Sequence, residues 1–131
     1  MSIPDIQLVR ERGKEYTQSQ QNKAVQRFVE YQQIKDQAIT HFYTILESSI
    51  NDQLLKGRKV SKRIEFRAVM DYIEHALKFR CTSCEYLEIL KCITDKVEKA
   101  YYDAGYITKQ ISYVHTHGSH FLDRYTVEIS F

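Results

Sequence analysis

Residues 121–131 read FLDRYTVEISF, and this stretch decides the fold class. After Asp123 the odd positions are apolar and the even positions are polar, which is the period of a strand with one buried face. Residues 107–115 alternate as well, with Ile111 and Tyr113 on one face, and the stretch THGSH between the two runs is typical of a turn. The sequence therefore predicts a C-terminal antiparallel hairpin. Its apolar face should lie on helices, because a lone two-stranded ribbon is marginal in water.

A long helix is expected in the first half of the chain. Apolar residues recur there at three- and four-residue steps over about nine or ten turns. Either Thr17 or Ser19 can cap its start, and Gly57 can end it. Residues 1–16 lack such a pattern and are expected to form an extended N-terminal arm, which leaves residues 17–131 as a single α+β domain.

Two shorter helices are expected before the hairpin. Ser61 can cap a second helix that ends near residues 79–80. Thr82 and Glu85 have the spacing of a capping box, in which each side chain bonds the other residue's backbone N–H, so a third helix should begin near Ser83. Gly105 suits the left-handed position after its end. The expected fold is α+β, with three helices, the first one long, followed by a C-terminal antiparallel β-hairpin packed on them.

Length and composition limit the function. A chain of 131 residues with 43% hydrophobic and 27% charged residues has the size and composition of one globular domain. The net charge of +2 is too small to indicate a nucleic-acid or anionic-membrane partner by itself. No apolar run approaches the roughly 20 residues of a membrane span, and the first residues lack the layout of a signal peptide. We expect no membrane partner and a reducing, cytoplasmic location.

Assembly through exposed apolar segments is the function that the pattern favours. The free edges of the hairpin can each accept a strand, from the N-terminal arm or from another copy of the chain. The early part of the long helix has a Gln-rich face, which is either a neutral solvated surface or a surface that packs on another subunit. The expected contacts lie in the arm, at Ile3, Ile6, Leu8 and Val9, and in the last strand, at Tyr125, Val127, Ile129 and Phe131.

A basic segment supports a second hypothesis, nucleic-acid binding. Six positive charges fall within twelve residues and are opposed by one carboxylate, Glu65. Lysine and arginine neutralise phosphates and release counterions regardless of base sequence. The residues are Lys56, Arg58, Lys59, Lys62, Arg63 and Arg67.

Cysteine and histidine supply the remaining reactive groups. Cys81, Cys84 and Cys92, with His115 and His117, include enough ligands for a zinc site, but the spacing lacks the two short knuckles that such sites use. The cysteines fit a buried or helix-flank position better, and a redox role for the Cys-x-x-Cys pair lacks the βαβ context. We therefore expect no metal, no cofactor and no small-molecule substrate.

A histidine cluster stands at the expected hairpin tip, at His115, His117 and His120. No carboxylate closer than Asp123 is available to orient a ring, and the sequence indicates no pocket around the cluster. Because imidazole titrates near pH 6.5, the hypothesis for these three residues is a contact that depends on protonation. No nucleophile, carboxylate pair or phosphate loop stands out elsewhere. The expectation is that the protein is not an enzyme.

Two resemblances bear on these hypotheses. Three helices and a hairpin, with DAGYI at residues 103–107, resemble the winged-helix family over residues 64–131. That resemblance implies DNA binding through the third helix and the hairpin tip. Residues 83–103, however, hold five acidic residues against three lysines, whereas a helix that enters the major groove should not be net negative.

The second resemblance concerns the C-terminus. The helix end AGY and the final strand TVEISF are similar to the ends of small uncharacterised proteins from tailed phages and other large DNA viruses. This resemblance implies an assembly role, in the host cytoplasm or the virion. The leading hypothesis is a non-enzymatic structural or interaction protein that forms a homo-oligomer or joins a larger, virion-type assembly through its arm, long helix and hairpin edge.

Overall fold

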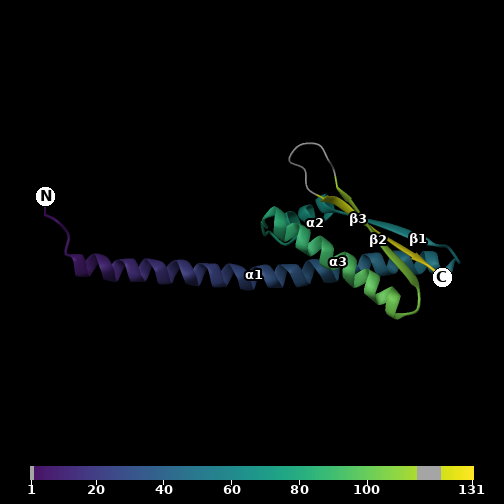
Figure 1. Cartoon of the computed structure of the whole chain (residues 1–131), viewed down its shortest axis with the longest axis horizontal. Coiled ribbons are helices and arrows are strands. Elements are labelled where there is room, and N and C mark those ends of the chain that lie inside the picture. The colour runs from purple at the N-terminus through teal and green to yellow at the C-terminus, as the bar shows by residue number, and fades with distance from the viewer. Residues whose placement is uncertain (1, 115–121) are drawn as a thin grey trace. The chain divides into compact units, whose positions relative to one another are not determined.

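The fold is α+β, with three helices and a three-stranded antiparallel sheet. A computed structural model describes residues 2–114 and 122–131. The elements follow in the order α1 (Ile6–Leu55), β1 (Val60–Glu65), α2 (Phe66–Asp71), a π-helical turn η1 (Tyr72–Ala76), α3 (Ser83–Asp103), β2 (Ile107–Val114) and β3 (Leu122–Ser130) (Figure 1). Two compact units divide the chain, residues 1–33 and residues 34–131, and each is described by itself.

The helix α1 begins earlier than the sequence pattern predicts. Asp5 is its N-cap: the Asp5 side chain accepts a hydrogen bond from the backbone N–H of Gln7 at 2.8 Å, and its carbonyl accepts one from Val9 at 3.1 Å. The helix therefore starts at Ile6 and not near Thr17. An extended conformation for residues 6–16 was a wrong prediction, because the short-range cap at Asp5 starts the helix without an apolar stripe behind it.

The sheet contains the predicted hairpin and one strand that was not predicted. Its order is β1-β3-β2, so both β1 and β2 pair with the central β3 in antiparallel fashion. The prediction of a helix capped by Ser61 is wrong, because residues 60–65 form β1 and α2 begins only at Phe66. These residues form a strand because the side chains of Val60 and Ile64 are buried where β1 pairs with β3. The predicted turn at 116–120 lies outside the described residues.

The helix α3 starts and ends where the sequence predicts. The Thr82 hydroxyl accepts a hydrogen bond from the Glu85 N–H at 3.2 Å, and the Glu85 carboxylate accepts one from the Thr82 N–H at 2.8 Å. Gly105 follows with φ of +98°. One face of α3 is buried, at Tyr86, Ile89, Leu90, Ile93, Thr94, Val97 and Tyr101.

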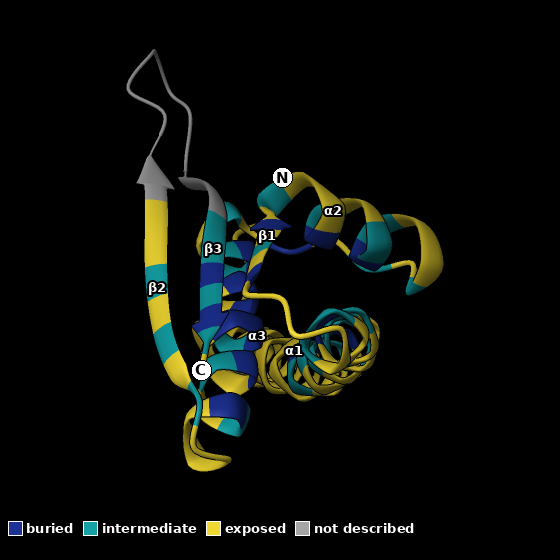
Figure 2. Ribbon diagram, turned by 90° about the vertical axis from the view of Figure 1, so that its right-hand side faces the viewer, coloured by how far each residue is buried: buried dark blue, intermediate teal, exposed yellow. Residues whose placement is uncertain are grey.

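The core of residues 34–131 forms where α3 packs against the sheet and against the second half of α1 (Figure 2). The sheet contributes Val60, Ile64, Val127 and Ile129, and α1 contributes Ala38 and Ile50. An ion pair of 2.6 Å between Lys35 and Glu88 also joins α1 to α3. These contacts join the sheet, α3 and the second half of α1.

The two faces of β2 are reversed relative to the expectation. Its Gln110 is paired with the buried Val127 and therefore lies on the helix side of the sheet, because directly opposed residues share a face. Ile111, paired with Thr126, lies on the outer face and is 39% exposed. The side of β2 that faces the helices is thus polar at Gln110, and the prediction that Ile111 packs on the helices is wrong.

A polar link holds that side of β2 in place. The Gln110 amide donates to Asp95 at 2.8 Å, and Lys91 donates to the Gln110 carbonyl at 2.7 Å. Burial alone would raise the pKa of Asp95, but the hydrogen bonds from Gln110 and Lys91 outweigh it and lower that pKa. This polar contact replaces the apolar one that the alternation had suggested.

Candidate functional site

The first half of α1 exposes apolar side chains along its length. All residues from 2 to 30 are exposed. Val25, Phe28 and Val29 are 63%, 61% and 49% exposed, and their spacing of three and four residues places them on one side of the helix. We call these three residues the α1 stripe. The four predicted contacts of the arm, Ile3, Ile6, Leu8 and Val9, are exposed as well.

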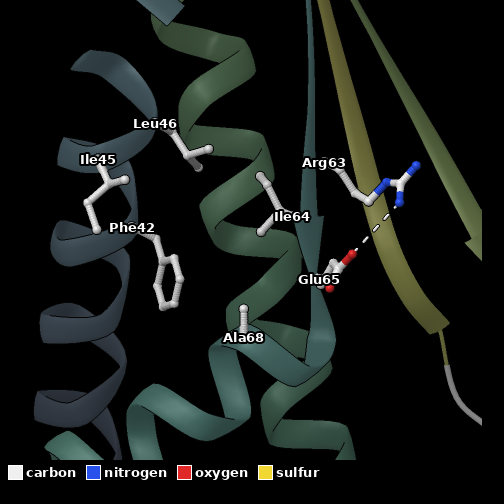
Figure 3. Close-up of a pocket in the computed structure, with 7 residues that line it drawn as sticks. All are labelled: Phe42, Ile45, Leu46, Arg63, Ile64, Glu65 and Ala68. Carbon is white, nitrogen blue, oxygen red and sulfur yellow. Dashed lines mark ion pairs between the residues drawn. The ribbon is translucent and has the colours of Figure 1, made fainter. Parts of the chain in front are cut away.

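An apolar pocket lies between α1, β1 and α2, within residues 34–131. It has a volume of about 330 Å³. Its apolar lining comes from three elements: Phe42, Ile45 and Leu46 on α1, Ile64 on β1 and Ala68 on α2 (Figure 3). Ile45 is 52% exposed. These residues were not predicted as a site, because Ile64 falls in the helix expected after Ser61, and Ile45 and Leu46 fall within one long helical pattern.

A charged pair closes the rim of this pocket. Arg63 and Glu65, both exposed on β1, form an ion pair of 3.8 Å (Figure 3). They point to the other side of the strand from Ile64, as alternate residues of a strand do. The pocket therefore has an apolar interior beside a charged outer face.

The predicted contacts of the last strand do not form an accessible edge. Val127 and Ile129 are fully buried in the core, and β3 is the central strand, with neighbours on both sides. Tyr125 is half-buried, and only Phe131, just after the strand, is largely exposed. The prediction that the free edge belongs to this strand is wrong, because β1 occupies it. The outer edges of the sheet belong to β1 and β2.

The six basic residues are placed along β1 and do not form one compact cluster. Lys56, Arg58 and Lys59 are exposed in the turn before the strand, and Arg67 is exposed after it. Lys56 pairs with Asp52 at 3.2 Å, and Arg58 bonds Gln53 at 3.4 Å. Lys62 is half-buried and shares the helix side of the sheet with Val127. Five of the six residues are thus exposed.

Ion pairs within α3 engage two of its three lysines. Lys91 pairs with Asp95 at 2.9 Å, and Lys99 pairs with Asp103 at 2.8 Å. The opposite face is packed in the core. These pairs leave α3 with few cations for phosphates, which weakens the DNA-binding role that the winged-helix resemblance implies for this helix. The hairpin tip, with His115, His117 and His120, lies outside the described residues.

The three cysteines differ in their surroundings. Cys81 is buried, Cys84 is exposed at the start of α3, and Cys92 is half-buried; none of them forms a disulfide. Within residues 2–114 and 122–131, no three His, Cys, Asp or Glu side chains gather in a way that could hold a metal ion. The candidate ligands His115 and His117 are not among these residues.

Two buried tyrosines anchor α3 through their hydroxyl groups. The Tyr86 hydroxyl donates to Glu74 at 2.9 Å and accepts from the Cys81 N–H at 3.0 Å. The Tyr101 hydroxyl donates to the Asn51 side chain at 2.6 Å. Burial raises the pKa of each tyrosine to about 12. Both hydroxyls are therefore protonated donors at neutral pH, and their partners are structural elements of the fold.

No family model, curated protein or solved structure matches this chain in the three comparisons made with known proteins. In the described part of the chain, no helix is both long enough and apolar enough to cross a membrane.

Proposed function

We propose that the protein is a non-enzymatic interaction protein that self-associates through the first half of α1. The exposed α1 stripe carries this proposal. A helix in a protein gains most of its stability by packing one face on another element, and no face of residues 6–30 is buried in the chain. A second helix that covers Val25, Phe28 and Val29 would supply that packing. The same surface supports the wider hypothesis of a larger, virion-type assembly.

The polar neighbours of the stripe fit association between copies. Glutamine is frequent along this half of α1, at positions 18, 20, 21, 26, 32 and 33. Neutral amides can pack near the same surface of another copy without the repulsion that like charges produce. The apolar triplet supplies the area that association removes from water, at roughly 25 cal/mol per Å².

Light scattering on the full-length chain tests this proposal. The variant Val25→Gln/Phe28→Gln/Val29→Gln removes the apolar groups and keeps good helix formers. We expect an oligomeric wild type and a variant of lower mass with unchanged circular dichroism. The matched control, Tyr102→Gln/Ile107→Gln/Ile111→Gln, changes three exposed apolar residues outside α1 and should keep the wild-type mass. A monomeric wild type, or loss of mass in the control alone, would contradict the proposal.

Nucleic-acid binding is the second candidate function. The observation in its favour is that five cations are exposed before, within and after β1: Lys56, Arg58, Lys59, Arg63 and Arg67. Six residues of strand span roughly 20 Å, which is several phosphate spacings. Fluorescence anisotropy with duplex DNA and with RNA at two salt concentrations tests it. Binding should weaken steeply with salt and with Arg58→Gln/Lys59→Gln, and salt-independent or absent binding rejects this candidate.

A further inference from the structure

The strand β1 is an edge strand with an open backbone. It pairs with β3 on one side, and among the described residues no strand pairs with its other side. In an antiparallel ladder alternate residues direct their N–H and C=O groups away from the neighbour. About half of the six residues of β1 therefore offer unpaired backbone groups to an added strand.

The apolar pocket lies next to this open edge. Figure 3 shows it on the side of β1 that faces α1, opposite to the side on which β3 lies. Ile64 forms its wall on β1, and Phe42 and Ile45 form the wall on α1. Side chains of directly opposed residues in neighbouring strands share a face. A strand added opposite Ile64 would therefore direct its side chain into the pocket.

The charge along the edge is positive. Lys59, Arg63 and Arg67 are exposed before, within and after β1, and Glu65 is the carboxylate at the pocket rim. The side chain of Arg63 lies on the outer face of the sheet, at the rim of the pocket. Residues of an added strand that neighbour Arg63 would share this outer face, where acidic side chains are favoured.

We propose that the open edge of β1 binds an extended segment of a partner protein in which aliphatic and acidic residues alternate. The segment adds a fourth strand beside β1, one aliphatic side chain fills the pocket, and acidic side chains lie next to Arg63 and its basic neighbours. Backbone hydrogen bonds supply affinity and the pocket supplies selectivity, as in other cases of strand addition. A second copy of β1 fits poorly because it is itself basic, and nucleic acid has no aliphatic group for the pocket.

A labelled peptide tests the proposal on the full-length protein. The probe is a fluorescein-labelled heptapeptide that alternates valine or leucine with aspartate, and its binding is followed by anisotropy. We expect saturable binding, together with slower hydrogen exchange at alternate backbone amides of β1. The control peptide has the same sequence with alternate amides N-methylated, which removes donors for the ladder. It should bind at least about tenfold more weakly.

Matched variants locate the site. Ile45→Glu places a charge in the pocket and should weaken binding about tenfold. Ile107→Glu changes another exposed isoleucine, on β2, and should alter binding less than about twofold. Arg63→Glu should weaken binding about threefold or more, and Lys109→Glu, an exposed cation on β2, should not. Circular dichroism confirms that all four variants fold.

Several results would overturn the proposal. Absence of saturable binding would do so, as would equal binding of the N-methylated peptide or equal effects of Ile45→Glu and Ile107→Glu. Pairing of two β1 edges, seen as a dimer that Ile45→Glu dissociates, would identify a second copy as the occupant instead. A competition experiment with duplex DNA gives the last such result. If the DNA displaces the peptide, and binds wild type and Ile45→Glu equally well, this edge binds nucleic acid instead.

Discussion

The Tyr101 hydroxyl on α3 donates a hydrogen bond of 2.6 Å to the side-chain oxygen of Asn51 on α1. It also lies 3.3 Å from the Glu47 carbonyl. Tyr101 itself is buried, with 6% of its surface exposed. The two residues are 50 positions apart in the sequence, so this bond ties the end of α3 to the end of α1.

Removing this hydroxyl should destabilise the protein. Tyr101→Phe leaves acceptors on Asn51 and Glu47 without their donor, and we expect the free energy of unfolding to fall by about 1–2 kcal/mol. Urea unfolding of Tyr101→Phe, Asn51→Ala and the double variant measures the coupling between the two side chains. Tyr102→Phe is the control, because Tyr102 is 68% exposed, and it should be neutral. Additive effects of the two single variants would show that the bond contributes nothing.

Alkaline pH should weaken the fold through its buried tyrosines. Burial raises the pKa of Tyr86 and of Tyr101 from 10.0 to about 12. The folded state favours the neutral hydroxyl, so the stability that it provides is complete below pH 10 and is lost as the pH rises towards 12. The loss is on the order of 2 kcal/mol for each tyrosine.

Urea unfolding at pH 9 and pH 11 measures the part of this loss that is reached by pH 11, which is about half of it. Lys35 also has a raised pKa, because of its hydrogen bond to Glu88, and contributes in the same direction. The variants Tyr86→Phe and Tyr101→Phe separate the tyrosines from the lysine, since each should reduce the difference in unfolding free energy between the two pH values. Wild type and both variants losing the same amount would refute this explanation.

The capping box at the start of α3 should stabilise the folded protein by a measurable amount. Thr82→Ala removes the hydroxyl that accepts from the Glu85 N–H, and we expect a loss of about 1 kcal/mol in the free energy of unfolding. Thr44→Ala is the matched control, because Thr44 is exposed in the middle of α1 and alanine is the better helix former. Thermal or urea unfolding should show opposite signs for the two changes, and equal signs would contradict the capping argument.

Two residues in the left-handed region should respond oppositely to substitution. Lys78 has φ of +56° after η1, where a side chain costs energy and glycine does not. Lys78→Gly should therefore raise the free energy of unfolding by about 0.5–1 kcal/mol. Gly105→Ala should lower it by about 1 kcal/mol, although the added methyl group meets open space, because φ there is +98°. Urea denaturation of both variants and of wild type measures the two changes in the free energy of unfolding.

The elements with strong local signals were predictable from the sequence. The third helix has a capping box at Thr82 and a glycine at Gly105, and the hairpin has a clear two-residue period. The strand β1 has a weaker signal, because Lys62 stands on the helix side between Val60 and Ile64 and interrupts the apolar alternation. The pairing of β1 with β3 is a contact between distant parts of the chain that no local pattern records.

The surfaces were less predictable than the elements. Exposure of the arm residues followed from the sequence, but the pocket depends on Ile45 and Ile64 meeting across two elements. The Pro4-Asp5 pair could have indicated the start of α1, since aspartate is a preferred N-cap. The burial of Val127 and Ile129 agrees with their alternation. The alternation could not show that β1 pairs with the edge of β3 that a two-stranded hairpin would leave open.

The place of β3 in the sheet affects how the protein is made. It is the last strand in sequence order and the central strand in space, and neither β1 nor β2 has another partner among the described residues. During synthesis, β1 and the apolar face of α3 are made before residues 122–130, which complete the sheet. During that interval the nascent chain exposes Val60, Ile64 and the core side of α3, which are the surfaces that a chaperone would bind.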